Sequence, residues 1–246
     1  MSRVEEAPSQ SYCQKVINLR IKTGIRGFDE TIQGGIVPNR IYVVSGPPGS
    51  GKTTFGVQFL AYGAGTGTPG LYVSLTRGSE ATIESMSNYN LNIPILIERG
   101  KLLFMDAKSV AVYGDTDTTI NPSTIYSEIV NTVRKHAVKR LVIDSMSTLR
   151  FSIRDRRSED EEVGRFIQNL KLLDVTTILL SEMIDPSIYA TEQYACDGLI
   201  FHHNFMRGRS MVRAIQVIKM CGTAHDCEMR KLGFAEDGLF VAGKIV

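Results

Sequence analysis

Short apolar runs alternate with amphipathic segments along most of this chain of 246 residues. Apolar runs of strand length lie at residues 41–45, 71–75, 102–105, 141–144 and 176–181. Apolar residues at helical spacing follow the first run, over residues 53–64, and several of the later ones. This alternation predicts βαβ units, and therefore an α/β fold with a mostly parallel central sheet flanked by helices.

Capping residues mark the beginnings of several predicted helices. Asn121 can cap a helix that has Pro122 at its first position, and isoleucines and valines then recur at helical spacing. Ser158 and Glu161 form the S-x-x-E pattern of a capping box, ahead of another apolar stripe. A further helix is predicted to begin near Ser79.

The end of the chain has a different pattern from the middle. Apolar runs at residues 199–202, 211–220 and 239–242 are separated by turn residues such as Gly208, which predicts an antiparallel C-terminal extension. Residues 1–20 contain few core-type residues in their first half. We therefore predict a flexible N-terminal arm over residues 1–20 and one domain over residues 21–246.

Composition excludes some classes of protein. Hydrophobic residues make up 43% of the chain and charged residues 22%, which is typical of a soluble globular protein. The net charge of +2 neither requires nor excludes nucleic acid as a partner. Four cysteines are too few for a disulfide framework in a chain of this size. No leader or apolar run long enough to span a membrane is visible, so we expect a cytoplasmic protein without membrane contact.

The segment GPPGSGKT at residues 46–53 matches the phosphate-binding pattern G-x-x-x-x-G-K-[ST]. Its glycines allow a tight turn in which backbone N–H groups point at phosphate oxygens, and the lysine adds a positive charge. The predicted ATP or ADP ligands are Gly46, Pro47, Pro48, Gly49, Ser50, Gly51, Lys52, Thr53 and Thr54. A strand before the segment and a helix after it are the context that the pattern requires.

A magnesium ion normally accompanies ATP at such a loop. The Thr53 hydroxyl is one predicted ligand, and an acid at the end of a later apolar strand should be the second group. Asp144 follows the apolar residues 141–143 and fits this position. The alternative is that Asp144 only caps the turn that follows its strand.

Three segments, taken in order along the chain, resemble RecA-superfamily domains of the KaiC and RadA kind. They are KTGIRGFDETIQGGIVPNRIYVVSGPPGSGKTT at residues 22–54, VIDSMSTLR at 142–150 and VIKMCGTAHD at 217–226. The chain thus resembles a single-domain archaeal KaiC-like or RadA-paralogue protein. The resemblance implies a RecA-like P-loop fold over residues 21–246, and a homo-oligomeric ring or filament with ATP bound between subunits.

The chain departs from the family pattern at two catalytic positions. The family has glutamate after the second strand, where this sequence has Thr76 and Arg77, and neither can act as a carboxylate base. In the family, a lysine and an arginine from the adjacent subunit reach the γ-phosphate. Lys219 matches that lysine, but Cys221 replaces the arginine.

Three residues remain as candidates for a catalytic role. They are Glu80 on the helix after the second strand, Ser181 at the position that senses the γ-phosphate, and Lys219 acting in trans. Ser181 can equally be an ordinary serine at a strand end. An arginine supplied in trans can be worth about 10³–10⁵ in rate, so the loss of base and arginine together predicts weak ATPase activity.

Two further sets of residues suggest other ligands. Arg150, Arg154, Arg156 and Arg157 form a basic cluster that could contact the phosphates of single-stranded DNA, with Tyr189 and Tyr194 as possible stacking groups. The alternative for the cluster is a solvated face, or pairing with the acidic residues 159–162 of a neighbouring subunit. Cys221, His225 and Cys227 lack the spacing of a metal site, and the neighbouring His202 and His203 are assigned no role.

Three functions fit these observations. The first is a recombination or repair accessory of the RadA-paralogue type, with weak ATPase activity and a RadA-type recombinase as partner. The second is a nucleotide-dependent switch that assembles without hydrolysis. The third is a KaiC-like autokinase. Thr76 and Cys221 favour the second mechanism, and the basic cluster favours DNA.

Overall fold

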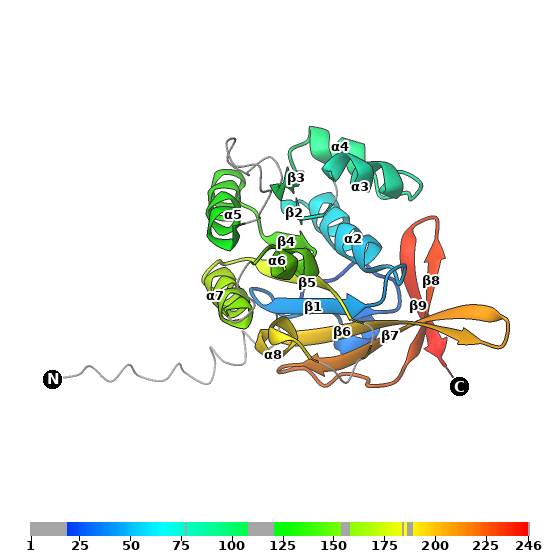
Figure 1. The fold of residues 1–246 in the computed structure, drawn as a ribbon. Helices are drawn as coiled ribbons and strands as arrows, with labels where there is room; N and C mark the ends of the chain where they lie inside the picture. The colour runs from blue at the N-terminus through cyan, green and yellow to red at the C-terminus, as the bar shows by residue number, and fades with distance from the viewer. Residues whose placement is uncertain are drawn as a thin grey trace.

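The computed structural model describes residues 19–76, 78–107, 121–153, 158–183, 185 and 189–245. Almost all of the predicted N-terminal arm lies outside these residues. Within them the chain forms a nine-stranded sheet in the order β3-β2-β4-β5-β1-β6-β7-β8-β9 (Figure 1). The strands are β1 Ile41–Gly46, β2 Gly70–Ser74, β3 Leu102–Asp106, β4 Arg140–Asp144, β5 Thr176–Glu182, β6 Gly198–Arg207, β7 Ser210–Met220, β8 Arg230–Ala235 and β9 Gly238–Lys244.

The sheet is parallel from β3 to β6 and antiparallel from β6 to β9. β1 pairs in parallel with β5 and β6, β2 with β3 and β4, and β4 with β5. The strands from β6 to β9 pair with antiparallel neighbours. The predicted α/β fold, with a mostly parallel sheet and an antiparallel C-terminal extension, is confirmed. β8 was missed because its run RKLGFA has too few apolar residues to stand out.

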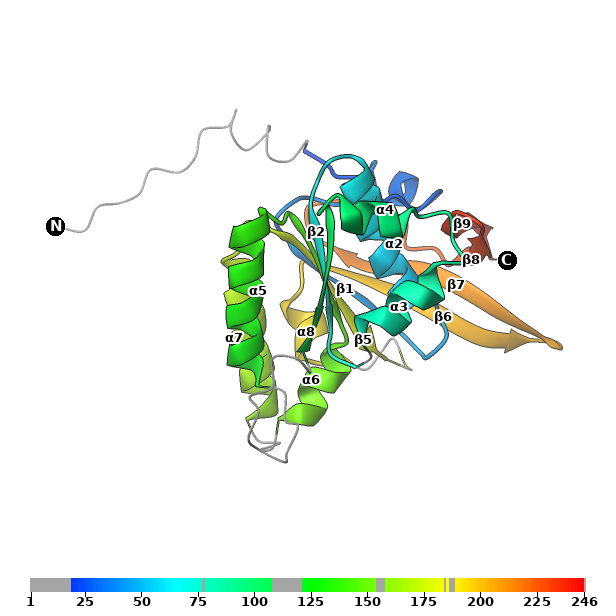
Figure 2. The ribbon, with the colours of Figure 1, turned by 90° about the horizontal axis from the view of Figure 1, so that it is seen from above.

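Helices cover both faces of the parallel part. They are the 3-10 helix η1 Asp29–Ile32, α2 Lys52–Gly65, α3 Ser79–Met86, α4 Ile93–Glu98, α5 Pro122–His136, α6 Met146–Ser152, α7 Glu159–Lys171 and α8 Thr191–Ala195. Figure 2 shows α2, α3 and α4 on one face and α5 and α7 on the other. Phe55 and Leu60 of α2 belong to the first hydrophobic core, and Ile129 and Phe166 to the second. Among the helices of the described residues, none has the length and apolarity that a membrane span requires.

The two predicted helix caps had different outcomes. The Asn121 side chain accepts from the backbone N–H groups of Ser123 and Thr124, which confirms the N-cap of α5. Ser158 is the N-cap of α7, but the predicted capping box is wrong. Ser158 has φ −93° and ψ −5°, which lie in the helical region, and its hydroxyl donates to Glu162 Oε1 at 3.4 Å. A cap residue with helical dihedrals does not direct its hydroxyl to the N–H groups of the first turn.

Strand register defines two opposite edges of the sheet. Gly46, Asp144 and Glu182 end parallel strands and lie at one edge, which we call the carboxyl edge. At the other, amino edge, Gly198 begins β6 and pairs with Met220 at the end of β7. Ligands of open α/β sheets bind outside the carboxyl ends of the strands, so the carboxyl edge is where a nucleotide site is expected.

Candidate nucleotide-binding site

The predicted phosphate loop connects the end of β1 to the start of α2. Gly46 has φ +154°, and a Cβ at this position would lie 2.3 Å from the carbonyl oxygen of His202. Gly51 has φ +95°, and a Cβ would lie 3.1 Å from Cζ of Phe234. Glycine at both positions allows a turn that a side chain would obstruct. The loop thus leads into the N-terminus of a 14-residue helix, whose backbone N–H groups and dipole favour phosphate.

The ammonium group of Lys52 is held within this loop. Its Nζ donates to the carbonyl oxygen of Gly46 at 2.7 Å and to that of Pro47 at 3.0 Å. Burial lowers the pKa of Lys52 below its usual value, while the negative charges of Glu182 and Asp144 act to raise it. A lysine in this place can bind the phosphate groups of a nucleotide as a point charge.

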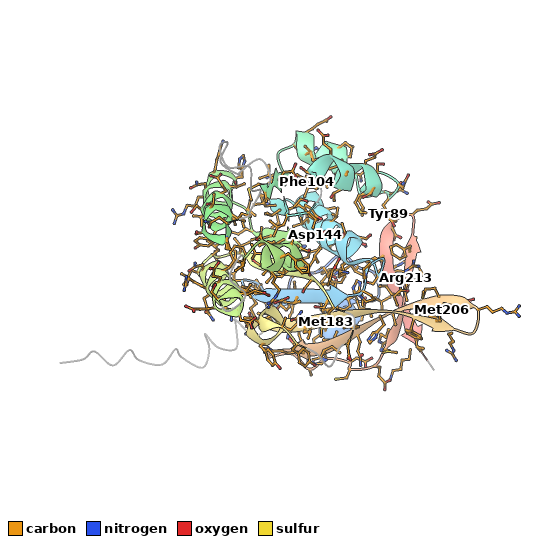
Figure 3. The ribbon with its side chains drawn as sticks, in the orientation of Figure 1. Tyr89, Phe104, Asp144, Met183, Met206 and Arg213 are labelled. Atoms are coloured by element: carbon orange, nitrogen blue, oxygen red, sulfur yellow. The ribbon has the colours of Figure 1, made fainter. Side chains whose placement is uncertain are left out.

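The two predicted magnesium ligands lie in direct contact. The Thr53 hydroxyl donates to Oδ2 of Asp144 at 2.8 Å, although the two residues come from separate motifs. Asp144 lies at the end of β4, close to α2 (Figure 3). Hydroxyl and carboxylate oxygens are ligands that suit Mg²⁺ beside phosphates. The pair would therefore hold the ion, which offsets the negative charge of the phosphates.

Tyr72 on β2 is a third group at this position, and the sequence did not mark it. Its hydroxyl donates to the same Oδ2 of Asp144 at 2.5 Å. Burial and the adjacent carboxylate raise the pKa of Tyr72 far above its usual value, so the phenol keeps its proton and remains a donor. A tyrosine inside an apolar strand is typical of core packing, and only the pairing of β2 with β4 reveals the contact.

We expect Tyr72→Phe to raise the Mg²⁺ concentration required for ATP binding by about tenfold. The phenol fixes the orientation of the Asp144 carboxylate, and groups that orient metal ligands are typically worth about 10–100-fold in metal affinity. Titration of a fluorescent ATP analogue at several Mg²⁺ concentrations measures the effect. Binding measured in EDTA should change far less, because without Mg²⁺ the orientation of the Asp144 carboxylate no longer matters, and the phenol's only loop contact in the described residues is with the Thr53 side chain.

Tyr42→Phe is the matched control for this prediction. The Tyr42 hydroxyl is also buried, and it donates to the Val37 carbonyl oxygen at 2.9 Å, at the other end of β1 from the loop. Tyr42→Phe therefore also removes one buried phenol hydrogen bond, but that bond does not involve Asp144. Equal Mg²⁺ dependence in both variants would show that Tyr72 has no role in orienting the carboxylate.

Glu182 supplies a second carboxylate beside the loop, and sequence reasoning missed it. It ends β5, opposite Gly46 in the register of β1 and β5, and its side chain is exposed. Its charge acts on Lys52 more strongly than that of Asp144. Thr76 follows β2 and is exposed, as is Glu80 in the first turn of α3. Glu182 therefore joins Glu80 as a candidate for activating water; the role of Glu80 stays a prediction from the sequence, and that of Glu182 is suggested by its position beside Lys52.

Ser181 belongs to a buried polar network at the ends of β1 and β5. Its hydroxyl donates to Glu192 Oε1 at 2.7 Å. Gln193 Nε2 donates to the hydroxyls of Ser45 at 3.1 Å and Ser181 at 3.4 Å. Side chains of α8 thus connect β5 to the strand that leads into the phosphate loop. A role of Ser181 in sensing phosphate stays a prediction, and this network is the route by which its hydroxyl contacts the rest of the domain.

Arg150 takes part in the same network as a structural cation. Its guanidinium forms ion pairs with Glu192 at 2.6 Å, Glu159 at 2.5 Å and Asp160 at 3.1 Å, and its side chain is 15% exposed. Glu192 is 1% exposed, so this cation balances a buried carboxylate. Arg150 thus pairs with the acidic segment of its own chain, whereas the sequence suggested such pairing with a neighbouring subunit. A guanidinium with three carboxylate partners has little capacity left for a DNA phosphate.

The other proposed DNA contacts have less structural description. Arg154, Arg156 and Arg157 lie outside the described residues. Tyr189 and Tyr194 pack edge to face with ring centroids 5.5 Å apart, and Tyr194 is 71% exposed. DNA contact by these residues stays a prediction.

Lys219 and Cys221 lie at the amino edge of the sheet, away from the phosphate loop of their own chain. Lys219 Nζ donates to the carbonyl oxygens of Cys196 at 2.6 Å and Tyr194 at 3.2 Å. Cys221 follows β7 and is exposed. The described residues contain no group of three side chains that could hold a metal ion at Cys221, His225 and Cys227 or elsewhere. Lys219 can therefore act on ATP only in another copy, as the resemblance implies.

His202 supports the phosphate loop, although the sequence indicated no role for it. The imidazole is fully buried on β6, and its Nδ1 lies 3.0 Å from the Ser50 carbonyl oxygen. A carbonyl can only accept, so Nδ1 carries the proton and donates. Burial lowers the pKa of His202 to about 3. The folded chain therefore keeps this imidazole neutral throughout the physiological range.

His202 should make the stability of the fold depend on pH. Between its unfolded pKa of about 6.5 and its folded pKa of about 3, only the unfolded chain binds this proton. The free energy of unfolding should therefore decrease as the pH is lowered through this window, by up to about 1.4 kcal/mol for each pH unit. Urea unfolding of the wild type and of His202→Asn between pH 7.5 and pH 4.5 isolates this contribution, because other groups titrate in both. Parallel pH profiles would contradict it. His203→Asn is the comparison variant: burial also lowers the pKa of this half-buried imidazole, but His202 is the more deeply buried, so His203→Asn should change the profile less.

Comparison with known protein families and with related sequences identifies similar proteins. The family model described as the ATPase KaiC matches residues 21–244. The circadian clock oscillator protein KaiC of Thermostichus vulcanus is 32% identical over 216 residues, which cover 84% of this chain and 41% of that protein. The protein of that name from Prochlorococcus marinus subsp. pastoris is 28% identical over 227 residues, with coverage of 90% and 45%. This chain thus spans less than half the length of these relatives.

A solved structure gives the same result for the fold. A KaiC-like protein from the hyperthermophilic archaeon Pyrococcus horikoshii OT3 superposes with a TM-score of 0.82 at 27% identity, over 92% of this chain and 99% of that one. The RecA-like P-loop fold inferred from three short segments is thus confirmed. With a family model that matches nearly all the described residues, this chain belongs to the KaiC family of ATPases, a branch of the RecA superfamily.

Proposed function

We propose that this chain binds ATP with Mg²⁺, assembles into a ring when ATP is bound, and hydrolyses the nucleotide slowly. The observation that carries the proposal is the convergence of the Lys52 ammonium, the Thr53 hydroxyl and the Asp144 carboxylate at the carboxyl edge. Together they match the charge and the metal ion of a nucleoside triphosphate.

Slow hydrolysis follows from the groups around this site. Thr76 supplies no carboxylate at the position of the family's glutamate, and Cys221 supplies no guanidinium. The carboxylates of Glu182 and Glu80 are the remaining candidates for water activation. Binding without rapid turnover suits a switch, in which the bound nucleotide controls assembly.

Assembly is supported by the position of Lys219. This cation lies at the amino edge, whereas the phosphate loop of the same chain lies at the carboxyl edge. Contact between Lys219 and a nucleotide therefore requires a second copy, placed with its carboxyl edge against this surface. Such a head-to-tail contact is heterologous, and it produces a ring when the rotation closes.

Two measurements on one sample test this proposal. Light scattering after gel filtration should show a several-fold larger mass with ATP and Mg²⁺ than with ADP or in EDTA. Turnover of ATP should be slow in the assembled fraction. Absence of ATP binding would overturn the proposal, and an unchanged mass with ATP bound would overturn assembly. Stimulation by single-stranded DNA would instead favour the recombination accessory; that role and the autokinase role stay predictions from the sequence.

A further inference from the structure

Three cationic side chains surround the turn at residues 221–223. Arg40 Nη1 donates to the Cys221 carbonyl oxygen at 2.8 Å. Arg20 Nη1 donates to the hydroxyl of Thr223 in this turn at 2.6 Å. Lys219 precedes the turn on β7 and donates to backbone carbonyl oxygens beside β6. Segments far apart in the sequence thus bring three positive charges to one place.

In the part of the chain that the structure describes, none of these three cations forms an ion pair, although the Asp197 carboxylate, which accepts from the Ile41 N–H at 3.0 Å, lies beside them. Arg150 and Arg230, by contrast, form close ion pairs with carboxylates. The side-chain hydrogen bonds of Arg20, Arg40 and Lys219 go to neutral oxygens. Neutral acceptors hold the three cations in place, and the single carboxylate of Asp197 offsets only part of their charge, so an excess of positive charge remains. A cluster of this kind attracts an anion, and guanidinium groups prefer phosphate or carboxylate.

The anion cannot be the nucleotide of the same chain. Arg40 immediately precedes β1, whereas the phosphate loop follows it. β1 has six residues, which span about 20 Å at about 3.3 Å each. In Figure 1, β1 runs toward the phosphate loop and β7 runs back toward the opposite edge. A second copy is therefore the source of any nucleotide phosphate that reaches the cluster.

We propose that Arg40 extends its guanidinium to the ATP of the adjacent copy, and supplies the group that Cys221 lacks. This inference rests on the proposed assembly. A Cβ on Gly222 would lie 3.6 Å from Nη1 and 3.8 Å from Nη2 of Arg40, so the guanidinium lies against the backbone next to Cys221. An arginine at position 221 would begin from this same backbone. The two sources therefore deliver a guanidinium to the same surface.

The chemical role is charge stabilisation during hydrolysis. A water oxygen forms a bond to the γ-phosphorus, the bond from that phosphorus to the β,γ-bridging oxygen breaks, and ADP leaves with the electron pair. The water proton passes to a nearby carboxylate or to solvent. Arg40 stays protonated throughout, and its planar N–H fork binds the γ-phosphate oxygens as charge shifts onto the leaving group.

Arg40→Gln should lower the turnover of assembled chains at least tenfold, while the affinity of dissociated chains for a fluorescent ATP analogue stays unchanged. Arg165→Gln is the control, because it removes an exposed arginine whose ion pair among the described residues is with Glu161 on its own helix. Cys221→Arg, added to Arg40→Gln, should restore the turnover. Equal turnover in Arg40→Gln and the wild type, at equal oligomeric mass, would overturn the inference.

A mixing experiment tests the action in trans. Lys52→Ala chains keep Arg40, and Arg40→Gln chains keep the phosphate loop. Alone, the first variant should be inactive and the second should have at most about a tenth of the wild-type turnover. When equal amounts mix at random, about a quarter of the interfaces should contain both intact groups, and activity should return. No recovery in mixed oligomers of confirmed composition would exclude Arg40 as a group acting in trans.

The readouts separate this inference from the proposed function. A wild type that fails to bind ATP or to assemble would refute the proposed function itself. If the assembled wild type shows no measurable turnover, the rate of ATP release is measured instead of turnover. Arg40→Gln should then release ATP several-fold faster than Arg165→Gln, and identical release rates would overturn the inference.

Discussion

Lys52→Ala should abolish ATP binding at nucleotide concentrations that saturate the wild-type chain. The ammonium is held by the carbonyl oxygens of Gly46 and Pro47, at the turn where phosphate oxygens would lie. Charge-assisted hydrogen bonds contribute about 1.5–3 kcal/mol each. The loss of two such bonds from Lys52 to phosphate oxygens should weaken ATP binding by at least about a hundredfold. Calorimetry or a fluorescent ATP analogue measures the change.

Two controls make this result specific to the phosphate loop. Lys171→Ala removes an exposed lysine from the last turn of α7 and should leave ATP affinity unchanged. Unfolding in urea should show that Lys52→Ala is folded, because within the described residues the side chain forms two hydrogen bonds, both to the loop itself. A folded Lys52→Ala chain with the ATP affinity of the wild type would refute the assignment of the phosphate site.

The parts of the site that could be predicted from the sequence are those with local patterns. The phosphate loop is a contiguous motif between a strand and a helix, and Asp144 ends an apolar run. Strand pairing then brings Thr53 and Asp144 together, as the general geometry of parallel sheets requires. The parallel part of the sheet was equally predictable from the sequence, because buried strands such as β4 and β5 are continuous apolar runs.

The parts that could not be predicted depend on pairs distant in sequence. Tyr72 contacts Asp144 across 72 residues, and His202 contacts Ser50 across 152. Arg40 reaches the turn at residues 221–223 across 181 residues. A tyrosine or histidine in an apolar strand looks like core packing, and an arginine before a strand looks like a solvated charge. Their partners are set by strand order and register, which no local pattern contains.

Thr76→Glu together with Cys221→Arg should raise ATP turnover about a hundredfold or more. Both positions are exposed, so neither new charge would be buried without solvent. Position 76 follows β2, whose Ser74 pairs with Asp144, so a glutamate there begins close to the metal ligands. A positioned general base contributes about 10²–10⁴-fold. Phosphate release from oligomers of equal mass measures the gain.

Thr76→Gln together with Cys221→Arg is the matched control for the base. Glutamine has the length of glutamate but no carboxylate, so this variant should not gain the factor that depends on proton transfer. Equal turnover in the two double variants would show that position 76 is not where water is activated. Glu182→Gln, made in the wild type, would then test the carboxylate that lies beside Lys52.

The effect of Cys221→Arg on turnover should depend on whether Arg40 is present. If Arg40 already supplies a guanidinium in trans, Cys221→Arg alone adds a second one to a surface that has one, and turnover should change little. In the Arg40→Gln background the same substitution should raise turnover strongly, toward the factor of about 10³–10⁵ seen for arginines supplied in trans. Non-additivity of this kind is expected when two groups perform one role. A Cys221→Arg effect of equal size in both backgrounds would show that the two guanidiniums act independently, and that the missing arginine is not replaced.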